Sequence, residues 1–174
     1  MHPAALPADL LERETHVERT RASGPGGQHR NRVQTAIRLR HEHSGVLAQA
    51  NERRSQHENL KVAYFRLRVN LAIEFRTPLT DSAFVSPGEY QPSEPWQSRL
   101  RKGRIKVNPT HADFPGVLAE VLDRLRIDQD DISRTATAFG VSVSQLVKFL
   151  ALEARALQNL NARRKTAGLN PLRG

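Results

Sequence analysis

Glycines gather beside one glutamine and several arginines in a short stretch of the chain, RASGPGGQHRNR, at residues 21–32. Each glycine at an ordered position costs about 0.5–1 kcal/mol of backbone entropy, so Gly24, Gly26 and Gly27 together cost about 2–3 kcal/mol. Such a cost indicates a backbone that must approach another surface closely or adopt angles that a side chain forbids. The sequence therefore predicts a narrow loop that presents Gln28.

The spacing of these glycines does not match either of two well-known phosphate-binding motifs. A P-loop needs a glycine, four residues and then Gly-Lys-Ser/Thr, and no lysine and hydroxyl stand at those positions. A dinucleotide-binding fingerprint starting at Gly24 would need a glycine where His29 stands. A tight turn between two elements is the ordinary alternative for a Gly-Gly pair, and these residues alone leave it open.

The charge of the chain favours a nucleic acid as the partner. The formal net charge is +9, and from Arg19 to Arg40 there are six arginines and no acidic residue. The planar guanidinium of arginine binds phosphates in a bidentate manner. The chain has no cysteine, which excludes disulfides and suits a reducing cytosol. No apolar segment approaches the length of a membrane span, so we expect a cytoplasmic protein without a membrane partner.

The first part of the chain predicts a small sheet packed by a long amphipathic helix. The expected strands are residues 16–23, 35–41 and 46–51, the last two forming a hairpin. Ser55 and Glu58 then form a capping box, and apolar residues follow at helical spacing. We therefore expect an α+β domain over residues 1–76.

Prolines interrupt the next part of the chain. Four of them exclude a long helix between residues 77 and 98: Pro78, Pro87, Pro92 and Pro95. Residues 77–111 are therefore predicted to be a proline-rich and basic linker. Its aromatic residues Phe84, Tyr90 and Trp96 are expected to hold it against a neighbouring part of the protein.

The last part predicts an all-α domain over residues 112–174. Pro115 stands where a first helical turn tolerates proline, and an apolar helical face follows it. Ala136, Gly140 and Leu146 have the offsets of a helix-turn-helix. The second helix of that pattern has few polar side chains that could read bases, so sequence-specific DNA binding is not expected.

The stretch from Val17 to Phe75 resembles the catalytic GGQ domain of class I peptide chain release factors and their ribosome-rescue relatives. The Gly-Gly-Gln at 26–28, Asn31, the AIRL strand, the turn at Gly45 and RSQH at 54–57 stand in the order and spacing of that family. The chain departs from the family at two places. The family usually has Lys-Thr after the asparagine, where this chain has Arg32 and Val33, and commonly has a glutamate in place of Arg53.

This resemblance implies hydrolysis of the ester that joins a nascent peptide to P-site tRNA. Gly26, Gly27 and Gln28 would form the catalytic loop, which enters the peptidyl transferase centre of the ribosome. The backbone N–H of Gln28 would donate to the developing oxyanion, and its side chain would order the attacking water. The tRNA and rRNA would supply the rest of the site, so no cofactor is expected. Gln28 is also the position at which family members are commonly N-methylated.

Further residues are expected to contact RNA. Around the loop and in the first domain they are Arg21, Ser23, His29, Arg30, Asn31, Arg32, Arg38, Arg54 and Gln56. In the basic run RLRKGRIK they are Arg99, Arg101, Lys102, Arg104 and Lys106. This run could follow a phosphate backbone, and a solvated loop is its alternative.

We expect a codon-independent hydrolase of the ribosome-rescue type. Only about sixteen residues precede the resemblance, which leaves no room for the preceding domain of a codon-reading factor. Rescue relatives typically carry a basic tail, whereas this chain has a linker and a helical part. Two other classes stay open, namely a ribosome-binding or RNA-binding factor without hydrolysis and a hydrolase of free peptidyl-tRNA.

A metal site is not expected from the sequence. His41 and His43 stand two residues apart and would share a face on a strand. Zinc normally takes three or four protein ligands, and the sequence offers no clear third one for this pair.

Overall fold

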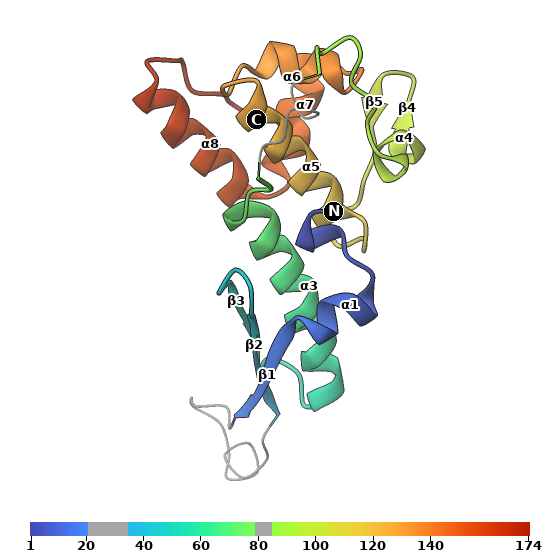
Figure 1. The fold of residues 1–174 in the computed structure, drawn as a ribbon, viewed down its shortest axis with the longest axis vertical. Helices are drawn as coiled ribbons and strands as arrows, with labels where there is room; N and C mark the ends of the chain where they lie inside the picture. Colours follow the sequence, from blue (N-terminus) through green and yellow to red (C-terminus); the bar gives the residue numbers. More distant parts are fainter. Residues whose placement is uncertain (21–34, 79–84) are drawn as a thin grey trace. The chain divides into compact units, whose positions relative to one another are not determined.

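A computed structural model describes residues 1–20, 35–78 and 85–174 of the chain (Figure 1). The chain divides into two compact units, Met1–Phe75 and Arg76–Gly174. The first contains a three-stranded sheet and a long helix, and the second contains several helices and a two-stranded hairpin. The α+β class expected from the sequence is confirmed. Within the described residues, no helix has the length and apolar character needed to cross a membrane.

The sheet of the first unit is antiparallel, in the order β1-β2-β3. Its strands are β1 (Thr15–Thr20), β2 (Ala36–His41) and β3 (Leu47–Ala50). Along β2, Ile37 and Leu39 are buried and the residues between and after them are exposed arginines, as the period-two pattern predicts. The apolar face of the sheet packs against a helix.

That helix is α3 (Gln56–Glu74), which lies along β2 and β3 (Figure 1). It begins at Ser55, whose side chain accepts a hydrogen bond from the Glu58 N–H at 3.3 Å. Ala63, Leu67 and Leu71 are fully buried at helical spacing. The long amphipathic helix predicted after the hairpin is therefore confirmed.

The N-terminal residues fold back onto this helix. They form the 3₁₀ turn η1 (Pro3–Ala5) and the short helix α1 (Ala8–Arg13). The imidazole Nε2 of His2 lies 3.2 Å from the Phe75 carbonyl, and Arg68 donates to the Ala4 carbonyl at 3.0 Å. The first residues thereby close the end of the first unit, which the sequence did not predict.

The second unit is mostly helical. Its described elements are α4 (Glu94–Arg99), β4 (Leu100–Arg101), β5 (Arg104–Ile105), α5 (Phe114–Ile127), α6 (Ile132–Ala138), α7 (Val143–Ala151) and α8 (Ala154–Thr166). Gly140 adopts a φ of +63° between α6 and α7, an angle that glycine takes without a side-chain penalty.

Trp96, which was expected to hold residues 77–111 against a neighbouring part of the protein, does so within the second unit. Trp96 is fully buried, and its ring packs on Phe139 and Phe149 at centroid distances of 4.5 and 5.6 Å. Its indole N–H donates to the Phe139 carbonyl at 3.1 Å. A tryptophan buries a large apolar area, which is enough to hold a proline-rich segment in place.

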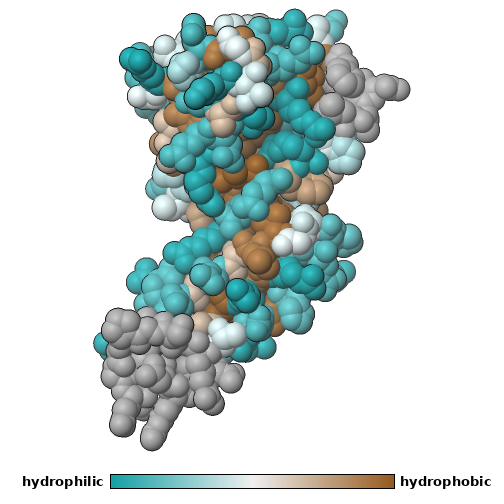
Figure 2. All heavy atoms as spheres, turned by 90° about the vertical axis from the view of Figure 1, so that its left-hand side faces the viewer, coloured by the Kyte–Doolittle hydropathy of each residue, from teal (hydrophilic) through white to brown (hydrophobic). Residues whose placement is uncertain are grey.

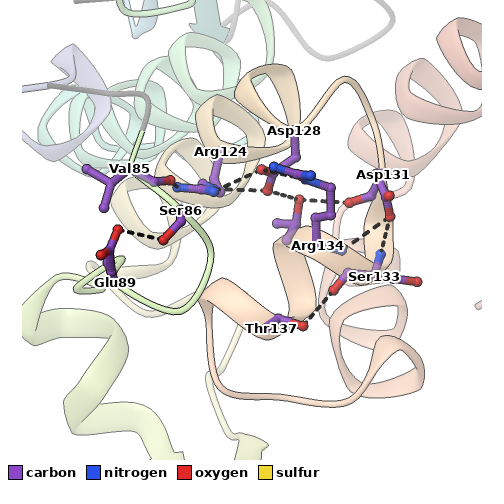
Figure 3. A network of polar contacts seen from close by, with 10 residues as sticks. Val85, Ser86, Glu89, Arg124, Asp128, Asp131, Ser133, Arg134 and Thr137 are labelled. Atoms are coloured by element: carbon purple, nitrogen blue, oxygen red, sulfur yellow. Dashed lines mark hydrogen bonds and ion pairs between the residues drawn. The ribbon is translucent and has the colours of Figure 1, made fainter. Parts of the chain in front are cut away.

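A buried ion pair connects α5 to its surroundings in the second unit (Figure 3). Arg124 donates from Nε and Nη2 to the Asp128 carboxylate, at 2.9 Å each, and both side chains are only 1% exposed. The Thr135 hydroxyl also donates to Asp128, at 2.9 Å. A third hydrogen bond runs from Arg124 to the Val85 carbonyl, and the guanidinium lies 5.0 Å from the centre of the Tyr90 ring. The end of α5, the segment that carries Val85 and Tyr90, and α6 therefore meet around this ion pair.

Candidate catalytic loop and RNA-binding surface

The predicted catalytic residues Gly26, Gly27 and Gln28 lie outside the described residues. The same is true of six predicted RNA contacts: Arg21, Ser23, His29, Arg30, Asn31 and Arg32. The structure describes the strands that flank this segment. Thr20 at the end of β1 pairs with Ala36 at the start of β2, so the two ends of the segment are held side by side.

Asn59 fixes the chain on the β2 side of this segment. It lies in the first turn of α3 and is fully buried. Its Nδ2 donates to the carbonyls of Thr35 and Arg53, at 2.7 and 3.0 Å, and its Oδ1 accepts from the Arg53 N–H at 2.9 Å. One side chain thus joins the entrance to β2, the connection from β3 and the start of α3. Sequence reasoning missed it, although a polar residue four positions before Ala63, on the buried side of the helix, was the available signal.

Asn59→Ala is expected to destabilise the protein by about 1–3 kcal/mol, because it leaves buried backbone groups without partners. Asn51→Ala removes an exposed asparagine from the same connection and should change stability by less than about 0.5 kcal/mol. The measurement is the free energy of unfolding of both variants in urea. An Asn59→Ala variant as stable as Asn51→Ala would show that this amide does not hold the connection together.

The other predicted RNA contacts of the first unit are exposed. Arg38 lies on the outer face of β2, where its nearest acidic group is Glu18, at 4.0 Å. Arg54 precedes α3 and Gln56 is its first residue. These side chains occupy two places, the outer face of the sheet and the start of the helix.

The basic run forms a small hairpin in the second unit, which we call the basic hairpin (residues 100–106). Leu100 pairs with Ile105 and Arg101 pairs with Arg104. Lys102 and Gly103 both have positive φ, +51° and +68°, as in the two-residue turns that suit the twist of a hairpin.

Like charges face each other across the basic hairpin. Arg101 and Arg104 are exposed cross-strand neighbours, flanked by exposed Lys102 and Lys106. Equal charges directly opposite each other destabilise a strand pair, so an anion bound between them would relieve repulsion. Arg99 differs, because it donates to the Asp113 carboxylate and lies beside His111. The structure therefore separates Arg99 from the four exposed cations.

If the basic hairpin contacts the phosphate backbone of RNA, as the sequence predicts, the double variant Arg101→Gln/Arg104→Gln should weaken binding to the ribosome and lower the slope of log K against log salt by about 1–2, since each phosphate contact contributes about 0.7–0.9. Arg126→Gln/Arg173→Gln removes the same charge from other exposed positions of the second unit and is the control. Equal slopes for the two double variants would contradict a specific role of the hairpin. The salt series is measured by ribosome sedimentation.

Hydrophilic side chains cover most of the face drawn in Figure 2, although apolar residues also reach that surface. Such a surface agrees with a charge excess of 27 basic over 18 acidic residues.

Comparison with known proteins gives the family. Residues 6–83 match the RF-1 domain. Peptide chain release factor 1 of Rhodospirillum rubrum is 30% identical over 145 residues, which cover 76% of this chain and 41% of the relative. Peptide chain release factor 2 of Janthinobacterium sp. is 35% identical over 141 residues, which cover 79% of this chain and 37% of the relative.

Residues 6–83 therefore form an RF-1 domain of the class I peptide chain release factor family, and the Gly-Gly-Gln motif lies within it. The chain spans less than half the length of the curated relatives it matches. The two matches span 145 and 141 residues, which is more than the 75 residues of the first unit. The similarity to these relatives therefore extends into the second unit. The sequence resemblance over residues 17–75 had not reached that far.

Proposed function

We propose that this protein hydrolyses the ester bond of peptidyl-tRNA on the ribosome without requiring a stop codon. The observation that carries the proposal is the Gly-Gly-Gln at 26–28, inside an RF-1 domain match and between two strands whose ends are paired. The relatives are named as peptide chain release factors, which supports the same reaction here.

In the proposed reaction, water attacks the ester carbonyl and the peptide leaves as a free acid. The bond to the terminal ribose oxygen of the tRNA breaks, and that oxygen takes a proton. The backbone N–H of Gln28 donates to the oxyanion that develops on the carbonyl, a type of contribution worth about 2.7–4 kcal/mol in hydrolases. The Gln28 side chain orders the water and excludes larger nucleophiles, while RNA forms the remaining walls of the site.

The partners in this proposal are rRNA and P-site tRNA. The exposed cations of the basic hairpin and Arg38 and Arg54 of the first unit suit phosphate backbones. Backbone contacts of this kind give affinity that depends on salt and not on base sequence.

The test is peptide release by the full chain from three ribosome complexes. One is stalled at the end of a truncated mRNA, one on an mRNA with an intact downstream stretch, and one at a stop codon. Release from all three supports the proposal, and the ratio of the first two rates reports whether an empty mRNA channel is sensed. Release only at the stop codon would overturn codon independence.

Two controls separate the remaining classes. Binding to the ribosome without release from any complex would favour the non-hydrolytic factor. Turnover of free peptidyl-tRNA by the protein alone would contradict a site that RNA completes.

A further inference from the structure

Three side chains meet at the end of the β1–β2 pair that lies away from the glycine segment. Glu14 stands between α1 and β1, His41 is the last residue of β2, and His43 follows in the turn to β3. Thr15 pairs with His41, and the Glu42 N–H donates to the Glu14 carbonyl at 2.8 Å. The backbone therefore holds Glu14 next to both histidines, although 27 residues separate it from His41 in the sequence.

The donor atoms of this cluster converge. The same carboxylate oxygen, Oε2 of Glu14, lies 3.2 Å from His41 Nε2 and 3.9 Å from His43 Nδ1. All three ligand atoms lie within 4.8 Å of one another. In a tetrahedral zinc site with bonds of about 2.0–2.1 Å, neighbouring ligand atoms are about 3.3 Å apart. Small side-chain movements would bring the cluster to that spacing.

The surroundings of His41 suit a metal ligand. The imidazole is only 1% exposed, and its Nδ1 lies 2.8 Å from the Ser44 hydroxyl. Ser44 Oγ also accepts the Val46 N–H at 3.3 Å, so the hydroxyl is held in place by the turn. Without an ion, Nε2 donates to the Glu14 carboxylate at 3.2 Å; an ion that replaces this proton would be bound by the Nε2 lone pair while Nδ1 donates to Ser44. Partners of this kind orient the ring in known metal sites.

The other two ligands allow an ion to reach the site. His43 is 71% exposed and Glu14 is 36% exposed. Two imidazoles and one carboxylate form a ligand set that binds Zn²⁺ in proteins, with water completing the tetrahedron. Calcium and magnesium prefer oxygen ligands, so this set discriminates against them.

We propose that Glu14, His41 and His43 form a binding site for a divalent transition-metal ion, with Zn²⁺ as the ion tested. The sequence offered only two histidines for such a site, and the third ligand appears because the strand register brings Glu14 to them. The ion would link the segment after α1 to the β2–β3 turn. Since β1 and β2 run from this cluster to the glycine segment at their other end, the ion would stabilise the first unit without entering the proposed reaction.

The experiment is calorimetric titration of the full chain with ZnCl₂, and with MgCl₂ as the negative control. Zn²⁺ is expected to bind with a stoichiometry of one, and His43→Ala and Glu14→Gln should each weaken binding by about 10–100-fold or more, the range for loss even of an outer partner. His16→Ala removes an exposed histidine from β1 and should leave binding unchanged. The thermal midpoint of the wild type should rise with Zn²⁺, and that of His43→Ala should not.

Several results would overturn the site. They are an absence of Zn²⁺ binding by the wild type, equal binding by His43→Ala, or the same loss in His16→Ala. The substituted residues are exposed or half-exposed, so these variants should fold, and unfolding curves without metal verify that. Peptide release is not the readout, so failure of the metal site and failure of the proposed hydrolysis remain distinguishable.

Discussion

Gly27→Ala is expected to slow peptide release by about 10²–10³-fold, the effect of losing one oxyanion donor in a hydrolase. In the proposed reaction, a methyl group at this position would either block the approach of the loop to RNA or forbid the backbone angles needed to direct the Gln28 N–H. The measurement is the single-turnover rate of release at saturating protein. Ribosome binding, measured separately by sedimentation, should remain, because the basic side chains are unchanged.

The matched control for this variant is Gly88→Ala. Gly88 is exposed in the second unit, and a Cβ at that position would meet no atom within 4 Å. The same chemical change is therefore made without a steric consequence. Equal release rates for Gly27→Ala and Gly88→Ala would remove the main support for hydrolysis by this loop.

Arg124→Met is expected to destabilise the second unit by about 3–5 kcal/mol, because it leaves the buried Asp128 carboxylate without its main cation. Asp128→Asn should have an effect of similar size for the reciprocal reason. The fluorescence of Trp96, the single tryptophan of the chain, reports unfolding of this unit in urea. The Arg124→Met/Asp128→Leu double variant should lose less than the sum of the single losses, since it leaves no unpaired buried charge.

The exposed pair Arg163–Asp130 provides the comparison for this network. Arg163 also makes a two-point contact, at 2.9 and 2.8 Å, but its side chain is 48% exposed. Solvent screens such a pair, so Arg163→Gln should cost no more than about 1 kcal/mol. If Arg124→Met and Arg163→Gln cost the same, burial does not determine the strength of these pairs.

The elements of the first unit could be predicted because their signals are local. Alternating residues in β2 and the Ser55 cap of α3 each act within a few positions of the chain. The packing of Trp96 against a neighbouring part was predicted, but its partner Phe139 could not be, since that contact spans 43 residues of the chain. The prolines of residues 77–111 therefore predicted a linker from local signals. The contact of Trp96 with Phe139, which brings part of this segment into the core of the second unit, is long-range.

The residues of the candidate sites also differ in whether local sequence was enough to identify them. The Gly-Gly-Gln motif is contiguous and was recognised from the sequence alone. Asn59 and Glu14 act through partners 24 and 27 residues away, at Thr35 and His41. Their roles depend on strand register and helix placement, which the residue types by themselves do not encode.

The pairing of the strands also has a consequence for the order of folding. Arg40 pairs with Leu47 across a short turn, whereas Thr20 pairs with Ala36 across fifteen residues, 21–35. Closing a loop costs about 0.6 kcal/mol more for each doubling of its length, so β2 and β3 should pair first and β1 should join afterwards from its Thr20 end, where the closed loop is shortest. The loop that contains the glycine segment is therefore closed only after β2 and β3 have paired. Substitutions within it should therefore leave the earlier β2–β3 pairing step unchanged, so the chemistry of this segment can vary without altering that step.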